Sequence, residues 1–180
     1  MKKNFGMWIF LATEVLIFGT LVILYEIFFY RYHRDFKVAS RDLHLLYGTL
    51  NTFLLLTSSY FVARAQETKA KKNLLWAMLL GVAFLGIKGH EYASLTQEGK
   101  FPLNFSATLT KSHELFLSFY AYLTVLHAFH LLVGIACLLW VYLTHRKTPL
   151  RLEENVGLYW HFVDIVWVFL YPIFYLAGNS

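Results

Sequence analysis

Five long apolar segments, separated by short polar ones, dominate the pattern of this chain. They cover roughly residues 5–30, 44–65, 73–95, 113–143 and 156–178. A helix that crosses a bilayer needs about 20 mostly apolar residues, and each segment reaches that length. The pattern therefore predicts an all-α, polytopic integral membrane protein. We expect a bundle of five transmembrane helices that forms a single domain over residues 1–180.

The polar stretches between these segments are interpreted as loops. The stretch after the first span, with Arg34, Asp35 and Lys37, is expected to be a short polar loop that carries solvated charge. Residues 64–72 form the most basic loop, and residues 96–112 read as a loop on the opposite side. Hydroxyl residues in the second span, such as those at 57–59, are typical of close helix packing.

Composition agrees with a membrane location. Hydrophobic residues make up 58% of the chain and aromatic residues 19%, which leaves little room for a water-soluble fold. The net charge of +5 is spread over the short loops and does not indicate a nucleic-acid partner. The single cysteine, Cys137, excludes an internal disulfide framework. Only Lys2 and Lys3 precede the first span, which is too long for a signal-peptide core and is expected to stay as a permanent helix.

The distribution of basic residues predicts the orientation. The side of the bundle that holds the N-terminus carries nine Lys and Arg: Lys2, Lys3, Arg64, Lys69, Lys71, Lys72, Arg146, Lys147 and Arg151. The other side carries six: Arg31, Arg34, Lys37, Arg41, Lys100 and Lys111. Because the basic side stays in the cytoplasm, we expect the N-terminus inside and the C-terminus outside.

Polar residues inside the spans are the candidate functional groups. Glu14 lies about 13 Å below the start of its helix at 1.5 Å per residue. His127 and His130 lie three residues apart, as do His161 and Asp164, so each pair shares a helix face. An unpaired charge in hydrocarbon costs several kcal/mol, which predicts that these five residues form one buried polar cluster. Glu14 would then either only fix helix packing or also hold a proton.

A second set of residues is predicted to lie at a surface. Lys88, His90 and Glu91 crowd the end of the third span, which is typical of a contact with lipid headgroups or with a partner protein. Trp160 and Trp167 on the last span are assigned to the same kind of contact.

Several other functions fit the buried histidines less well. A bis-histidine haem would need His127 or His130 opposite His161, but carboxylates share that region and no second histidine pair repeats. A di-metal centre would prefer Glu-x-x-His on several helices. A proton-coupled transporter would show repeated halves, which five helices do not give. Phosphate-loop, nucleophile-elbow and zinc-protease motifs are absent from the sequence.

Five motifs in one order carry a resemblance to a known family. They are Gly6-Met7-Trp8 with Ala12-Thr13-Glu14-Val15, Asn51-Thr52 with Leu56-Thr57-Ser58-Ser59, Gly89-His90-Glu91-Tyr92, His127-x-x-His130 with Gly134, and Tyr159-Trp160-His161-Phe162-Val163-Asp164 with Trp167. Together they resemble subunit III of the haem-copper oxidases, the cytochrome c oxidase subunit III family, over essentially the whole chain. The last motif is the most specific.

The resemblance implies a five-helix form of a family whose longer members have seven helices. In the longer form the first two helices make one arm of a V-shaped cleft that holds phospholipid. Either another subunit supplies that arm here or the cleft is incomplete. Glu14, the histidine pair 127/130 and the pair 161/164 match the family's polar positions. His90 departs from the aromatic or apolar residue often found before the Glu-Tyr pair.

The implied role is that of an accessory subunit in aerobic electron transport. Such a subunit carries no haem or copper itself, packs against catalytic subunit I beside subunit II and other subunits, binds phospholipid, and helps to sustain proton uptake. Haem and copper are expected in the partner subunits. The implied location is the bacterial cytoplasmic membrane. Within the resemblance, an accessory protein of a nitric oxide reductase or of a quinol oxidase is the alternative.

Overall fold

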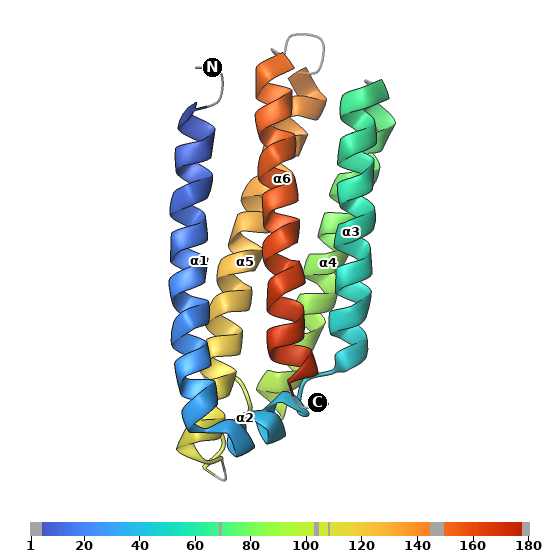
Figure 1. Cartoon of the computed structure of the whole chain (residues 1–180). Helices are drawn as coiled ribbons and strands as arrows, with labels where there is room; N and C mark the ends of the chain where they lie inside the picture. Colours follow the sequence, from blue (N-terminus) through green and yellow to red (C-terminus); the bar gives the residue numbers. More distant parts are fainter. Residues whose placement is uncertain (1–4, 69, 103–104, 108, 145–149, 178–180) are drawn as a thin grey trace.

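Five long helices run up and down in one bundle in the computed structural model, which describes residues 5–68, 70–102, 105–107, 109–144 and 150–177 (Figure 1). The long helices are α1 (Phe5–Arg31), α3 (Leu45–Thr68), α4 (Lys71–Gln97), α5 (Lys111–Thr144) and α6 (Leu150–Tyr171). A short helix α2 (His33–Ser40) follows α1, and a π-helical turn η1 (Pro172–Leu176) continues α6.

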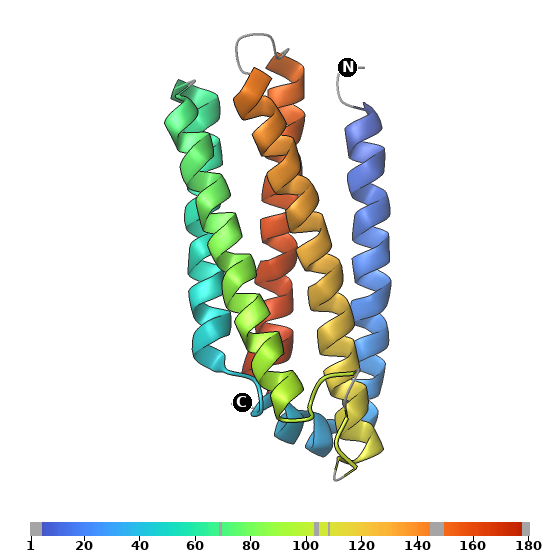
Figure 2. The ribbon, with the colours of Figure 1, turned by 180° about the vertical axis from the view of Figure 1, so that it is seen from behind.

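The predicted all-α membrane fold is confirmed. Within the described residues, five helices are long and apolar enough to cross a bilayer. The start of α1, the α3 end, the α4 start and the start of α6 lie at one end of the bundle, which we call the first end. Helix α2 and the end of η1 lie at the other, the second end (Figures 1 and 2). Long helices that follow one another in the sequence are therefore antiparallel.

The stretch after α1 is partly helical, so the prediction of a loop there was wrong. Helix α2 buries Phe36, Ala39 and Ser40. Phe36 is fully buried and packs against the rings of Tyr25 and Phe116. Because Phe36 and Ala39 are three residues apart, one face of a short helix reaches the core while Arg34 and Asp35 stay exposed.

Three of the long helices make close contacts around one tryptophan. The ring of Trp160 on α6 lies between Gly81 of α4 and Gly134 of α5, and a Cβ atom added at either glycine would lie 3.0 Å from that ring. Small residues permit such close approach in membrane bundles. Trp160 itself is fully buried.

Helix α1 is attached by a single stripe of side chains. Its buried residues are Leu11, Glu14, Phe18 and Tyr25, which share one face at helical spacing. The opposite face, which includes Trp8 and Leu16, is exposed and apolar. That face is directed toward lipid or toward another membrane protein.

The turn η1 closes the bundle at the second end. Pro172 has no amide hydrogen and cannot continue the α-helical bonding pattern. Two backbone carbonyls of the turn accept hydrogen bonds from other elements: Ser40 Oγ donates to Phe174 O at 2.5 Å, and Tyr25 Oη donates to Ile173 O at 3.2 Å. The turn thereby buries both Phe174 and Tyr175.

Candidate functional site

A carboxyl group and an imidazole meet between α1 and α5. Glu14 Oε2 lies 3.0 Å from His130 Nε2, and both side chains are nearly buried. His130 Nδ1 lies 2.8 Å from the carbonyl oxygen of Leu126, and the ring packs edge-on against Phe18. Tyr159 Oη donates to the backbone carbonyl of His130 at 3.1 Å.

These contacts show which nitrogen of His130 carries a hydrogen and how many protons the pair shares. A carbonyl oxygen only accepts, so His130 Nδ1 carries its hydrogen and donates to Leu126. The contact between Nε2 and Glu14 then needs one further proton, which lies either on the imidazole, giving an ion pair, or on the carboxyl, giving two neutral groups. Both states have no net charge, and a group without net charge is what the membrane interior tolerates.

The structure brings together only two of the five residues predicted to cluster. His161 Nδ1 lies 2.5 Å from Ser59 Oγ on α3. His127 is fully buried between the rings of Phe84 and Trp167, and its ring nitrogens have no hydrogen-bond partner among the described residues. The two side-chain oxygens of Asp164 likewise have no hydrogen-bond partner in the described part of the chain.

A ladder of hydroxyl contacts joins α3 to α6. The contacts are Thr49 Oγ1 with Tyr171 Oη at 2.8 Å, Trp167 Nε1 to Thr52 Oγ1 at 3.1 Å, Trp160 Nε1 to Ser58 Oγ at 3.1 Å, and Ser59 Oγ with His161 Nδ1. Each indole N–H finds a hydroxyl acceptor, as a buried tryptophan requires. The hydroxyl residues of the second span therefore act at a helix interface.

The most strongly connected polar group inside the bundle is Lys88 of α4. Its ammonium donates to Glu91 Oε2 at 2.9 Å, to Tyr120 Oη at 2.8 Å and to Tyr175 Oη at 2.6 Å. Tyr175 Oη is also 2.8–2.9 Å from both oxygens of Glu91. The ammonium further lies 4.8 Å from the ring centre of Trp167. All three donors of the lysine are used, so the buried charge is fully compensated.

The surface assignment for this region is corrected by the structure. Lys88 is 2% exposed and Glu91 fully buried, and Trp160 and Trp167 are also buried, so these four side chains contact helices of this chain. Of the five residues assigned to a surface contact, only His90 is exposed, and its ring centre lies 5.7 Å from that of Tyr47. Charges at a span end often snorkel to the interface, but here the partners lie inside the bundle.

Sequence reasoning missed the tyrosines of this site. Lys88 and Glu91 are opposite charges three residues apart, and that spacing was a usable signal for a pair on one helix face. Tyr120 lies on α5 and Tyr175 on η1, 32 and 87 residues from Lys88. Only the packing of three elements reveals them.

Charged groups at the second end form a separate network. Asp42 accepts from Lys100 Nζ at 3.2 Å and lies 2.7 Å from His113 Nε2, and Lys100 also donates to Glu98 at 2.8 Å. The hydrogen bond to Glu98, followed by that to Asp42, raises the pKa of the Lys100 ammonium against the opposing effect of partial burial. These contacts join the segment after α2 to α4 and α5.

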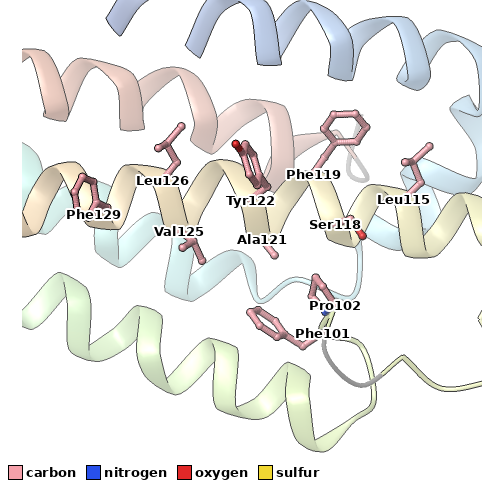
Figure 3. A pocket seen from close by; sticks show the side chains of 10 residues that line it. All are labelled: Phe101, Pro102, Leu115, Ser118, Phe119, Ala121, Tyr122, Val125, Leu126 and Phe129. Carbon is pink, nitrogen blue, oxygen red and sulfur yellow. The ribbon is translucent and has the colours of Figure 1, made fainter. Parts of the chain in front are cut away.

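An apolar groove runs along the outer side of α5. Its cavity volume is about 820 Å³, and it is lined by α5 residues together with Phe101 and Pro102 from the connection after α4 (Figure 3). Phe119, Tyr122 and Phe129 contribute aromatic walls from successive turns of α5 (Figure 3). The groove is thus apolar and lies on a membrane-spanning helix.

No group of three or more His, Cys, Asp and Glu side chains that could hold a metal ion occurs among the described residues. The fold and its interior define a class: an all-α, multi-pass membrane protein with several hydrogen-bonded polar contacts between its helices.

Comparison with known proteins identifies the family. Residues 43–179 match the model of the family described as cytochrome c oxidase subunit III. The chain is 29% identical to cytochrome c oxidase subunit 3 of Alkalihalophilus pseudofirmus over 98% of its length and 87% of the relative's. It is 30% identical to the protein of the same name from Bacillus sp. strain PS3, over 98% of its own length and 86% of the relative's. It is 29% identical to cytochrome bo(3) ubiquinol oxidase subunit 3 of Pseudomonas aeruginosa, over 97% of its own length and 84% of the relative's.

The chain belongs to the cytochrome c oxidase subunit III family. The resemblance carried by the five motifs is thereby confirmed. Its relatives and its five apolar helices support a multi-pass bacterial membrane protein that is an oxidase subunit.

Proposed function

We propose that the chain is the accessory, non-redox subunit III of a haem-copper terminal oxidase. In this proposal it packs against catalytic subunit I, with subunit II and other subunits in the same complex, and haem and copper belong to those partners. Family membership supports the assignment. The exposed apolar face of α1 supports packing against another membrane subunit, because only one stripe of that helix is needed inside the chain itself.

The proposed lipid binding is supported by the groove on α5. Within the hydrocarbon layer an apolar groove of about 820 Å³ is filled by acyl chains rather than by water, since its walls offer almost no polar partner. We therefore assign a phospholipid acyl chain to the groove in Figure 3.

The proposed support of proton uptake rests on one observation, the hydrogen bond between Glu14 and His130. This contact holds one exchangeable proton between two groups in the membrane interior, and it lies on α1, whose opposite face is free for a partner. Release of this proton leaves a net charge of −1 on the pair, so the proposed exchange requires a compensating positive charge from the partner subunit at the same time.

The test is Glu14→Gln in the assembled oxidase, with Glu26→Gln as the matched control on the exposed face of α1 near its end. Glutamine keeps the shape and a hydrogen bond to His130 but removes the exchangeable proton. We expect normal assembly, with turnover that slows or fails early and most strongly at alkaline pH, where protons are scarce. If Glu14→Gln assembles and turns over like the parent and like Glu26→Gln at every pH, the proton role is refuted and the pair only fixes packing.

The absence of a redox centre is tested on the purified subunit in detergent. An absorption spectrum without a Soret band and a metal analysis without stoichiometric copper are expected. A stoichiometric Soret band would replace this proposal by haem ligation.

The proposed orientation places the N-terminus and the first end of the bundle in the cytoplasm. The nine-to-six bias of basic residues supports it. In a Cys137→Ala background, Ala70→Cys should react with an impermeant thiol reagent only from the cytoplasmic side, and Asn179→Cys only from the outside. Labelling of position 70 from the outside would reverse the orientation.

A quinol oxidase is the second candidate complex, because the similarity to the Pseudomonas aeruginosa ubiquinol oxidase subunit equals that to the cytochrome c oxidase subunits. Identification of the catalytic subunit that copurifies with the chain decides between the two electron donors.

A further inference from the structure

A hollow lined by aromatic, polar and cationic side chains lies at the first end of the bundle, between the end of α3 and the start of α4. Its volume is about 410 Å³, and its lining includes Tyr60, Phe61, Arg64, Lys72 and Asn73. It lies on different elements from the groove along α5, which is lined by α5 and the connection after α4.

Two cations from different helices face this hollow. Arg64 lies on the last turns of α3 and Lys72 on the first turn of α4. Arg64 pairs with Glu67 at 3.8 Å, but both side chains are more than half exposed, so this long contact holds the guanidinium only weakly. No carboxylate in the described part of the chain pairs with Lys72. Two positive charges are therefore available at the hollow.

Hydrogen bonds between the end of α3 and the start of α4 fix the backbone that carries the two cations. Asn73 Nδ2 donates to Thr68 Oγ1 at 3.1 Å, and Thr68 Oγ1 donates to the carbonyl oxygen of Arg64 at 2.7 Å. The end of α3 is thereby tied to the start of α4 independently of any ligand. The hollow is formed before a ligand arrives.

Aromatic rings form the membrane-facing wall. Phe61 stacks against Trp76 of α4 with ring centres 6.4 Å apart and an angle of 26°. Tyr60 and Trp76 are both more than half exposed. Aromatic rings at a helix end mark the level where hydrocarbon meets headgroups. The hollow therefore presents positive charge on its outer rim and apolar rings toward the bilayer core.

This polarity matches one class of ligand, an amphipathic molecule with a negatively charged head. We propose that the hollow binds an anionic phospholipid, with Arg64 and Lys72 on the phosphate oxygens and Tyr60 and Phe61 against the upper part of an acyl chain. A guanidinium suits phosphate through two parallel hydrogen bonds, and an ammonium adds a point charge. A zwitterionic lipid binds more weakly because its own cationic group is repelled by the same two residues.

Trp76 does not line the hollow, but its ring stacks on Phe61, which does, so its fluorescence reports on a lipid bound there. In a Trp8→Phe/Trp140→Phe background it is the one tryptophan that is exposed, because Trp160 and Trp167 are buried. The full chain is reconstituted into phosphatidylcholine vesicles in which a small fraction of the lipid is replaced by dibrominated phosphatidylglycerol or, in parallel, by dibrominated phosphatidylcholine. Bromine quenches tryptophan at contact, so the ratio of quenching measures preference for the anionic lipid at this position.

We expect brominated phosphatidylglycerol to quench Trp76 more strongly than brominated phosphatidylcholine. Lys72→Gln should lower the affinity for phosphatidylglycerol relative to phosphatidylcholine about fivefold, and Arg64→Gln should lower it about fivefold again. Each basic residue near the membrane surface contributes about one such factor. The matched control is Lys71→Gln. Lys71 carries the same charge one residue away, but its ammonium lies 5.5 Å from the Tyr142 ring of α5 and does not line the hollow.

Three results would overturn the assignment. Equal quenching by the two brominated lipids would show that no anionic lipid is held there. An equal effect of Lys71→Gln and Lys72→Gln would show a general surface charge rather than a site. Loss of the preference on addition of inorganic phosphate, at constant ionic strength set with chloride, would assign the hollow to free phosphate. None of these readouts uses oxidase activity, so failure here is separate from failure of the proposed function.

Discussion

Lys88→Met should destabilise the chain strongly. Methionine fills a similar volume but removes the charge that compensates Glu91, which is fully buried. Breaking one partner of a buried ion pair costs about 3–5 kcal/mol, because the remaining charge stays in a medium of low polarity. Glu91 keeps the contact with Tyr175 Oη, so we expect a value near the lower limit, about 3 kcal/mol.

The effects of substituting Lys88 and Glu91 should also be coupled. Glu91→Gln alone leaves the Lys88 ammonium buried with only hydroxyl and ring partners, and it should also be costly. Lys88→Met combined with Glu91→Gln removes both charges, while Tyr120 and Tyr175 remain 3.1 Å apart and can bond each other. The double variant should therefore be less destabilised than the sum of the singles by about 2–3 kcal/mol.

The assay is unfolding of the purified chain by increasing sodium dodecyl sulfate in mixed micelles, followed by tryptophan fluorescence. Trp167 reports directly, since its ring is 4.8 Å from the Lys88 ammonium. Additive losses in the two single variants and the double variant, or a loss below about 1 kcal/mol for Lys88→Met, would refute the view that compensation of the buried charge holds α4, α5 and η1 together.

Three further outcomes are expected. Gly134→Ala should be less stable than Gly86→Ala by about 1–3 kcal/mol in the same unfolding assay, because a methyl group at 134 meets the Trp160 ring at 3.0 Å while nothing lies within 4 Å at 86. Phe36→Ala should cost about 3–5 kcal/mol, since the ring is fully buried; a loss under about 1 kcal/mol would show that α2 is not docked. The pKa of Lys100 is raised in the folded chain, so its stabilisation is complete below the usual lysine value and is lost as pH rises through the folded value; an alkaline unfolding titration of Lys100→Gln should lack that step.

Much of the fold could be predicted from hydropathy, because the bilayer imposes helix length and type. The predicted spans agree with the five long helices within a few residues at most ends, and antiparallel packing follows from short connections. Helix α2 escaped prediction because only three of its eight residues are apolar, and so short a segment gives no periodicity that a longer window detects. The π-turn after Pro172 shifts which residues face inward, and no spacing rule reveals it.

The interior was predicted less completely. Rise per residue places Glu14, His130 and Asp164 at comparable depth, but depth does not tell which helices are neighbours or how each is rotated. Glu14 meets His130, whereas Asp164 lies on the α3 side of α6, where the hydroxyl ladder runs. Lys88 was wrongly assigned to the surface because its tyrosine partners come from elements distant in sequence, and the sequence does not show that these elements are neighbours.

The two buried acid–base contacts differ in how they arise during synthesis. Lys88 and Glu91 lie on one helix three residues apart, so they enter the membrane already together as a neutral unit. Glu14 and His130 are separated by 116 residues. At a translation rate of roughly 5–20 residues per second, α1 waits on the order of ten seconds before α5 is made. Throughout that interval the acid of the first helix has no partner from its own chain, so α1 depends on the insertion machinery, or on a neighbouring subunit already in the membrane, to hold it until the imidazole arrives.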